Sequence, residues 1–275
     1  MHYKEEVERP ATGGDLGHVD GVLLDIDGVL TVSWRPIAGA PETLAWLRRE
    51  AIPFRLITNT TTISRTRLAG VLREAGFGVE REEILSAASA TGAYLRAHHP
   101  GARCFVLGET VDLAEDLEGI DLVGEGADVV VVAGADDDFT WAHMNRALGM
   151  LLDGAELVAM QRNLTWLTDE GLKFDAGPYV AGLELASGKR AALVGKPDPG
   201  FFHQGLEALD LPAERVAMVG DDLAFDVLAA QALGLTGVLV RTGKFLPEVD
   251  HRREQEPDVV VSSIAELPRL LGTRA

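Results

Sequence analysis

Two aspartates, Asp25 and Asp27, stand two residues apart, directly after the apolar run Gly21–Leu24. A carboxylate can attack phosphorus and form an acyl phosphate, which divides one difficult displacement into two easier ones. A second carboxyl group nearby can protonate the departing oxygen and later activate the water that hydrolyses the intermediate. Gly28 follows and allows the chain to turn sharply. The pair therefore indicates nucleophilic chemistry on a phosphorylated compound.

A second acidic group follows another apolar run, where Asp221 and Asp222 are adjacent and Asp226 comes one helical turn later. Carboxylates that converge on one cleft repel each other, so their convergence implies a cation. Oxygen ligands without thiolate or imidazole favour Mg²⁺. Such an ion would neutralise phosphate charge and allow one anion to attack another.

Three further side chains are suited to binding an anion. Thr58 and Asn59 offer a hydroxyl and an amide just before a helix that starts at Arg65, whose N-terminal dipole favours anions. Lys196 follows the apolar run 191–194 and is suited to pairing with the oxygens of a transferred phosphoryl group. Each feature alone is common in turns and solvated loops. Four polar clusters that each follow an apolar run predict a functional site.

These clusters must be positioned by the elements that precede them. Short apolar segments alternate with amphipathic ones, which predicts an α/β fold with a doubly wound parallel sheet covered on both faces. Ligands bind such sheets outside the carboxyl ends of the strands, so the four clusters are expected to meet there. Strands are predicted at 21–25, 54–58, 104–107, 129–133, 157–160, 216–220, 238–240 and 259–261, and helices at 41–50, 65–75, 140–152, 199–209 and 223–233.

The composition excludes several classes of protein. The chain has 275 residues and a formal net charge of −18, which argues against general nucleic-acid binding but permits a phosphorylated substrate at a local cluster of cations. Cys104 is the only cysteine, so no intramolecular disulfide forms and a cytoplasmic setting is expected. No apolar run approaches the roughly 18 residues of a membrane span. The acidic run 136–138 is interpreted as a solvated turn.

At this point the chain resembles the haloacid dehalogenase (HAD) superfamily of phosphatases over nearly its whole length. The four clusters are similar, in order and spacing, to its four motifs: Leu24–Leu30, Thr58–Asn59, Lys196 and Gly220–Asp226.

Further segments resemble the class IIA branch, which includes nucleotide, pyridoxal phosphate and nitrophenyl phosphate phosphatases. They are 175–180, Leu183-Glu184, 194–197 and 237–245. The Gly-Asp-Asp form of the fourth motif is similar to the subgroup that contains phospholysine phosphohistidine inorganic pyrophosphate phosphatase.

The resemblance implies a role for each motif residue. Asp25 would be the nucleophile and Asp27 the general acid and base. Asp25, the backbone carbonyl of Asp27 and Asp221 would hold Mg²⁺.

The same resemblance implies that Thr58, Asn59 and Lys196 bind phosphate. Asp222 and Asp226 would lie behind the metal ligands, where they would orient Lys196 or waters on the metal.

The resemblance also implies a cap domain of α/β structure, inserted at 85–187 between two parts of the catalytic core at 20–84 and 188–275. Residues 1–19 are expected to form a poorly ordered tail. The cap would close over the cleft, exclude water and select the leaving group. Relatives commonly dimerise through the cap, and the sequence leaves open whether this chain forms a homodimer.

One segment departs from the family pattern. Gln161-Arg162 stands near the place where relatives often carry Asp or His before Asn163. Arg162 is open to two interpretations: it meets a second anionic group of the substrate, or it is a surface side chain.

Two alternatives to a phosphatase remain. A dehalogenase on the same fold also uses an aspartate nucleophile, but it needs neither Mg²⁺ nor Asp27, and the Asp221 cluster argues against it. A phospho-accepting regulator gathers similar acids and a lysine on a parallel sheet, but such domains are much shorter and lack an inserted cap.

Overall fold

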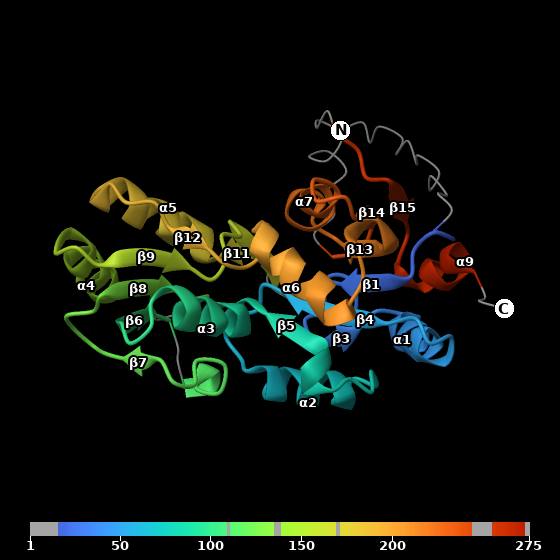
Figure 1. Cartoon of the computed structure of the whole chain (residues 1–275), viewed down its shortest axis with the longest axis horizontal. Coiled ribbons are helices and arrows are strands. Elements are labelled where there is room, and N and C mark those ends of the chain that lie inside the picture. The colour runs from blue at the N-terminus through green and yellow to red at the C-terminus, as the bar shows by residue number, and fades with distance from the viewer. Residues whose placement is uncertain (1–15, 109–110, 135–138, 169–170, 244–254, 273–275) are drawn as a thin grey trace.

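The computed structural model describes residues 16–108, 111–134, 139–168, 171–243 and 255–272. Two parallel sheets organise these residues, a six-stranded sheet to the right of Figure 1 and a five-stranded sheet to the left. The predicted solvated turn at 136–138 lies outside the described residues.

The six-stranded sheet forms the core domain, with the strand order β15-β14-β13-β1-β4-β5 and every pairing parallel. After β1 the chain adds β4 and β5 on one side of that strand, and it later adds β13, β14 and β15 on the other side. The order therefore reverses between β1 and β13, which is where open α/β sheets bind their ligands. The strands are β1 (Gly21–Leu24), β4 (Phe54–Thr58), β5 (Ile84–Ser86), β13 (Val216–Gly220), β14 (Thr236–Val240) and β15 (Val259–Val261).

Helices cover both faces of this sheet because successive strand residues point to opposite sides. Val22 and Leu24 pack in one hydrophobic cluster with α1, α2 and α9, whereas Leu23 packs in another with α6 and α7. The doubly wound arrangement predicted from the alternating pattern is confirmed. The helices are α1 (Ala40–Arg49), α2 (Arg65–Glu74), α6 (Pro199–Leu209), α7 (Ala229–Gln231) and α9 (Leu267–Leu271).

The five-stranded sheet belongs to the cap, with the order β12-β9-β8-β6-β7. Helices α4 and α5 cover one face and α3 the other, and the cluster under α3 continues into the core sheet, so the two domains share buried apolar side chains. These elements are β6 (Arg103–Leu107), β7 (Asp121–Leu122), β8 (Val129–Val132), β9 (Glu156–Ala159), β12 (Ala192–Leu193), α3 (Ala87–His98), α4 (Trp141–Leu152) and α5 (Ala176–Ser187).

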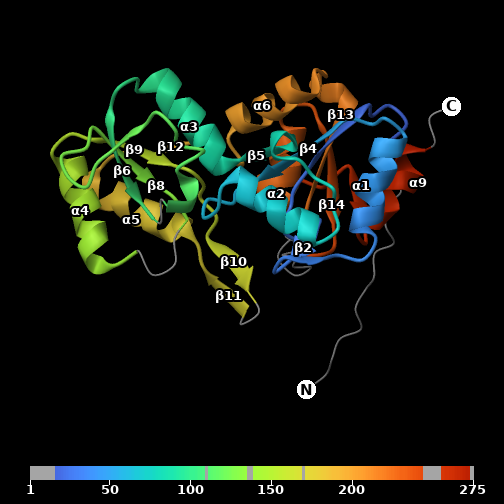
Figure 2. The ribbon, with the colours of Figure 1, turned by 90° about the horizontal axis from the view of Figure 1, so that it is seen from below.

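Two short antiparallel hairpins complete the strands, one from each domain. In the core, β2 (Thr31–Val32) pairs with β3 (Arg35–Pro36), and in the cap β10 (Thr165–Thr168) pairs with β11 (Gly171–Phe174). Both lie on the lower side of the molecule in Figure 2. The shorter helical turns are η1 (Arg81–Glu83), η2 (Val111–Leu113), η3 (Ala213–Arg215), η4 (Leu223–Leu228) and η5 (Ile264–Glu266).

The structure differs from the expected boundaries in three places. Leu16 and Val19 are buried in the core cluster, so residues 16–19 are not part of a tail. Strand β12 pairs with β9 of the cap sheet, although it was assigned to the core. The helix predicted at 223–233 is a π-helical turn, η4, followed by the single turn α7. In the described part of the chain, no helix is long and apolar enough to cross a membrane.

The start of the cap follows from local sequence. Ser86 ends β5 and caps α3, because its hydroxyl accepts the Ser89 N–H while the Ser89 hydroxyl accepts the Ser86 N–H, both at 3.1 Å. This reciprocal pair satisfies two backbone donors that a helix start otherwise leaves open. The chain therefore passes from the core sheet into the first cap helix without a loop.

The environment of Cys104 predicts an inert thiol. Burial in the cap sheet, aided by the charges of Asp128 and Asp121, raises the pKa of this thiol to about 11. Because the thiolate is the reactive form, we expect the folded protein to react at most slowly with an aromatic disulfide reagent at about pH 8. The same reagent should label one thiol per chain once a denaturant is added. Rapid labelling of the folded protein would contradict this assignment.

Candidate active site

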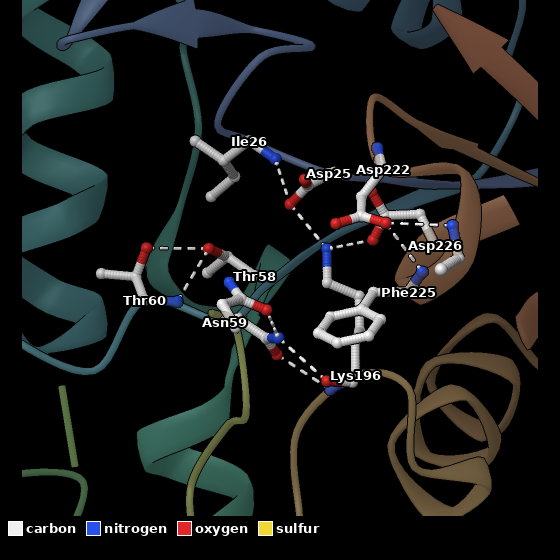
Figure 3. A network of polar contacts seen from close by, with 11 residues as sticks. Asp25, Ile26, Thr58, Asn59, Thr60, Lys196, Asp222, Phe225 and Asp226 are labelled. Carbon is white, nitrogen blue, oxygen red and sulfur yellow. Dashed lines mark hydrogen bonds and ion pairs between the residues drawn. The ribbon is translucent and has the colours of Figure 1, made fainter. Parts of the chain in front are cut away.

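Asp25 is positioned by the parallel ladder between β1 and β13. Its backbone N–H donates to the Val219 carbonyl at 2.9 Å, which carries the ladder one residue beyond the end of β1. The residue is 7% exposed, and its Oδ1 accepts the Ile26 N–H at 2.8 Å and contacts Lys196 Nζ at 2.7 Å (Figure 3). The carboxylate is therefore held in one orientation at the switch point of the sheet.

Lys196 connects two acids at the base of the site. Its Nζ lies 2.7 Å from Asp25 Oδ1 and 2.7 Å from Asp226 Oδ1, and the residue is 2% exposed (Figure 3). Burial by itself lowers the pKa of this amine. The charges and hydrogen bonds of the two carboxylates outweigh burial and raise the pKa above its ordinary value. Lys196 therefore stays a cation while it is buried.

The strand that precedes Lys196 belongs to the cap sheet and not, as expected, to the core. Strand β12 belongs to the cap sheet, so Lys196 is carried into the site by the segment that returns from cap to core. Asn59, at the end of β4, holds this segment: its Nδ2 donates to the Lys196 carbonyl at 2.9 Å and its Oδ1 accepts the Lys196 N–H at 2.8 Å.

The side-chain amide of Asn59 is engaged within the protein, and binding of phosphate by Asn59 stays a prediction. Besides the two bonds to Lys196, its Nδ2 donates to Asn163 Oδ1 of the cap at 3.2 Å. These three contacts engage both the oxygen and the two N–H donors of the amide. Asn59 positions Lys196, and it also connects the core to the cap. Thr58 lies beside it with its hydroxyl 2.8 Å from the Thr60 hydroxyl.

Asp222 and Asp226 form the turn that follows β13. Asp222 Oδ1 accepts the N–H groups of Ala224 and Phe225 at 3.0 Å, so its carboxylate caps η4 and does not contact Lys196. Its backbone N–H donates to Asp226 Oδ2 at 3.2 Å. Asp226 therefore has one oxygen on Lys196 and the other on this backbone, which orients the lysine.

The charges of this cluster leave an excess of negative charge. Burial, together with the charges of Asp25 and Asp222, raises the pKa of Asp226 above its ordinary value, while Lys196 opposes that shift. Asp221 lies opposite and is also buried. In the described part of this cluster, one ammonium group lies among three buried carboxylates, an arrangement that a bound cation would stabilise.

The three acids are placed to hold such a cation. One oxygen from each of Asp25, Asp221 and Asp226 lies within 4.8 Å of the others. Because both oxygens of Asp226 are already engaged, Asp25 and Asp221 are the better ligands. The donor set is oxygen only, and it fits a hard cation of the Mg²⁺ type.

Two glycines make room for the Asp221 carboxylate. Gly28 and Gly243 have φ angles of 82° and 67°, which L side chains rarely adopt. A Cβ at Gly28 would lie 2.0 Å from Asp221 Oδ2, and one at Gly243 would lie 2.1 Å from the same atom. Any side chain at either position would therefore displace the Asp221 carboxylate.

Core and cap together line one pocket of about 200 Å³ over this cluster. The Gly134 N–H of the cap donates to the Thr61 hydroxyl of the core at 2.6 Å, and Gln161 Nε2 donates to Asp175 Oδ1 at 2.5 Å. All eight residues that the sequence singled out line this pocket: Asp25, Asp27, Thr58, Asn59, Lys196, Asp221, Asp222 and Asp226.

Comparisons with known proteins agree with this arrangement. The sequence profile of the haloacid dehalogenase-like hydrolase family matches residues 22–123, and that of the HAD-hydrolase-like family matches residues 193–267. The phospholysine phosphohistidine inorganic pyrophosphate phosphatase of Homo sapiens is 36% identical over 265 residues, which cover 94% of this chain and 96% of that protein. This chain belongs to the haloacid dehalogenase-like hydrolase family.

Solved structures extend the similarity to the whole architecture of this HAD chain. The 4-nitrophenylphosphatase of Thermotoga maritima superposes with a TM-score of 0.86 and 28% identity, covering 94% of this chain and 99% of that one. The p-nitrophenyl phosphatase of Archaeoglobus fulgidus has a TM-score of 0.83 and 31% identity, covering 90% and 98%. The protein is therefore a phosphatase of the class IIA branch, with a separate cap sheet.

The structure decides between the two interpretations of Arg162 in this HAD protein. Its guanidinium makes two bonds to Glu184 of α5, at 2.6 and 3.3 Å, and Arg162 is not among the residues that line the pocket. Burial raises the pKa of Glu184, but bonds from the Ala191 N–H and from Arg162 outweigh it, and the net shift is downward. Arg162 therefore forms an ion pair within the cap that stabilises the position of α5.

Several pocket residues were not identified from the sequence. Thr61, Gln161 and Asp175 join the cap to the core or shape its wall, and Trp34 and Trp166 line the same pocket. Gln161 and Asp175 were noticed only as parts of larger segments. Gln161, Trp166 and Asp175 belong to the cap, and only its docking on the core brings them to the catalytic motifs.

Proposed function

We propose that this HAD phosphatase hydrolyses a small phosphorylated compound through an aspartyl phosphate on Asp25, with Mg²⁺ as its cofactor. The observation that carries the proposal is the position of Lys196, whose ammonium group bridges Asp25 and Asp226 at 2.7 Å beside the buried Asp221. A nucleophilic carboxylate, a fixed cation and a second acid that can hold a metal are the parts that phosphoryl transfer needs.

The reaction takes place in two successive displacements at phosphorus. The Asp25 carboxylate forms a bond to phosphorus while the bond from phosphorus to the leaving oxygen breaks, and Asp27 gives that oxygen its proton. Asp27, now ionised, takes a proton from water as the water oxygen bonds to phosphorus. The bond from phosphorus to Asp25 breaks, which releases phosphate and restores both carboxyl groups.

The remaining residues hold the phosphoryl group. The Lys196 ammonium and the Thr58 hydroxyl are the donors for its oxygens, and Asn59 keeps the Lys196 backbone in place. Asp25, the carbonyl of Asp27 and Asp221 would hold Mg²⁺, which neutralises phosphate charge when bound. The cap excludes water from the pocket and selects the leaving group.

Dehalogenation is the second candidate, and it is disfavoured by the site. A halide leaving group needs no general acid, so it gives no reason for Asp27 or for a metal-binding Asp221. A stable phosphoprotein is disfavoured by the cap, which encloses a pocket over Asp25. A cytoplasmic location and a homodimer formed through the cap stay predictions.

Removal of the metal tests the proposal. We expect release of phosphate from p-nitrophenyl phosphate in Mg²⁺ to fall at least about 100-fold after treatment with a chelator, because the carboxylates of the site then repel the anionic substrate. Added Mg²⁺ should restore the rate. Circular dichroism of the chelated protein serves as the control for folding.

Two results would contradict the proposal. Turnover of a halocarboxylate that chelator does not affect would favour the dehalogenase. A phosphorylated protein that persists for minutes without releasing phosphate would favour the phospho-accepting regulator.

A further inference from the structure

The segment from the end of β4 to the start of α2, residues 58–65, is named the Thr58 loop. Its first five residues, 58–62, line the pocket. The Thr58 hydroxyl accepts the Thr60 N–H at 3.1 Å and lies 2.8 Å from the Thr60 hydroxyl (Figure 3). The position of the Thr58 hydroxyl, a proposed donor to the phosphoryl oxygens, therefore depends on the shape of this loop.

Two residues inside the Thr58 loop contact the cap where both domains line the pocket. Asn59 Nδ2 donates to Asn163 Oδ1 at 3.2 Å, and the Thr61 hydroxyl accepts the Gly134 N–H at 2.6 Å. A Cβ at Gly134 would lie 2.3 Å from Thr61 Oγ1, so the backbone of the cap approaches the loop closely. The loop is therefore held between core and cap rather than by the core alone.

Asp116 of the cap binds the other end of the Thr58 loop. Its Oδ2 accepts the Arg65 N–H at 3.1 Å, and its Oδ1 accepts the Arg65 Nε–H at 2.7 Å. Arg65 is the first residue of α2, and the first N–H groups of a helix have no partner inside the helix and favour a negative charge. The Asp116 side chain is 0% exposed, so the two bonds to Arg65 compensate the burial of its charge.

The cap segment that carries Asp116 is itself fixed. It lies between β6 and β7 of the cap sheet, and its Leu113 and Leu117 side chains are buried in the cluster under α3. A Cβ at Gly92 of α3 would lie 2.1 Å from the Asp116 carbonyl oxygen, so this segment packs closely on the helix. A change in the position of the cap would therefore move Asp116 and the loop end that it binds.

Asp116 acts from outside the pocket. Among the described residues that line the pocket, neither Asp116 nor Arg65 is present. A neighbouring ion pair between core and cap, Arg67 with Asp112, has side chains that are 58% and 32% exposed, and such exposed pairs contribute little to stability. Of these two pairs, the buried one is the better able to hold the loop against the cap.

From these contacts we propose that Asp116 is a positioning residue for the Thr58 loop, so that docking of the cap sets where the loop meets the phosphoryl group. The proposal rests on the proposed function, since it takes this loop to bind phosphate. It gives the cap a second role besides selecting the leaving group, because the phosphoryl group is common to all substrates. A misplacement of about 1 Å in a reaction site can lower the rate about 100-fold.

Binding of inorganic phosphate tests this role, because phosphate has no leaving group for the cap to select. Calorimetry in Mg²⁺, well below the melting temperature, measures the affinity of the folded protein. We expect Asp116→Asn to bind phosphate at least about fivefold more weakly, because the amide has one acceptor oxygen where the carboxylate has two. Removal of a negative charge would by itself strengthen binding of an anion, so the expected change has the opposite sign to a general charge effect.

A second variant alters the same contact from the core. Arg65→Met leaves the buried Asp116 carboxylate without its cation and should weaken phosphate binding at least about threefold. The two variants change the net charge in opposite directions, so a loss of affinity in both excludes a long-range electrostatic cause. The double variant should bind phosphate within about twofold of Asp116→Asn, because both changes act through one contact. If Asp116→Asn does not fold, Arg65→Met decides by itself.

Asp128→Asn is the matched control. Asp128 accepts the backbone N–H and the Nε–H of Arg103 at 2.9 and 3.2 Å, as Asp116 does with Arg65, but both partners belong to the cap. This variant removes the same charge without altering a contact between the domains. It should therefore leave phosphate affinity within about twofold of the unmodified protein.

The outcomes separate the positioning role from the proposed function. Unchanged phosphate affinity in folded Asp116→Asn or in folded Arg65→Met overturns the positioning role, even if the melting temperature falls. An equal loss of affinity in Asp128→Asn also overturns it. If the affinities change as expected but no phosphate ester is hydrolysed, the positioning role stands and the proposed function fails. If the unmodified protein does not bind phosphate, both fail.

Discussion

Replacing Asp25 with asparagine is expected to lower phosphate release by at least about 10⁴-fold, because the amide cannot attack phosphorus. The change keeps the size of the side chain, and the carbonyl oxygen can still accept the Ile26 N–H bond that orients it. The loss should therefore appear in kcat with p-nitrophenyl phosphate rather than in folding. Steady-state assays with purified protein measure it.

A matched surface variant isolates the effect of the nucleophile. Asp153→Asn makes the same chemical change at an exposed residue at the end of α4 and should leave kcat within about twofold of the unmodified protein. Both variants should melt within a few degrees of the parent. If Asp25→Asn retains a tenth of the activity or more, Asp25 is not the nucleophile.

Replacing Lys196 with methionine is expected to affect both stability and activity. The change leaves Asp25 and Asp226 buried beside each other without the cation that lies 2.7 Å from both. Removing one partner of a buried ion pair typically costs about 3–5 kcal/mol, which corresponds to a decrease in Tm of about 10 °C for a chain of this size. Phosphate release should fall to background because the phosphoryl oxygens lose their fixed cation.

The loss of stability in Lys196→Met should depend on pH. Burial raises the pKa of Asp226 above its ordinary value, and removing Lys196 removes the charge that opposes this rise, so the folded variant binds more protons than the unfolded chain. Its stability then falls as pH rises from the unfolded pKa through the folded one. The deficit in Tm in metal-free buffer should therefore be larger near pH 8 than near pH 5.

A double variant distinguishes charge from packing. Lys196→Met combined with Asp226→Asn removes one of the two uncompensated charges, so it should recover much of the lost Tm without recovering activity. If the double variant is as unstable as Lys196→Met, the destabilisation arises from lost packing of the lysine side chain and the charge argument is wrong.

The core sheet was predictable from sequence because its strands are buried on both faces. Such strands are continuous apolar runs, as in Val216–Gly220, and the polar residues that follow them mark the carboxyl edge of the sheet. Strand β5 was not predicted because it has only three residues, too few for a period to be visible.

The π-helical turn after Asp222 was not predictable from sequence. The spacing of Leu223 and Val227 is helical, and it predicts an ordinary helix over 223–233. The Asp222 carboxylate accepts two successive backbone N–H groups, and its own N–H is drawn to Asp226, which alters the first turn. A side chain that competes with the helix for backbone N–H groups in this way does so only where the fold places the neighbouring acids close to it.

The sequence by itself determined which acids line the pocket, because Asp25, Asp27 and Asp221 each follow a buried strand that is visible as a run of apolar residues. Only the tertiary structure showed what the side chains of Asn59 and Arg162 contact. Asn59 binds the Lys196 backbone and Asn163 of the cap, and Arg162 pairs with Glu184. The contacts of Asn59 depend on how the cap docks on the core, and that of Arg162 depends on how the cap itself folds. Residues distant in sequence carry no local signal of either contact.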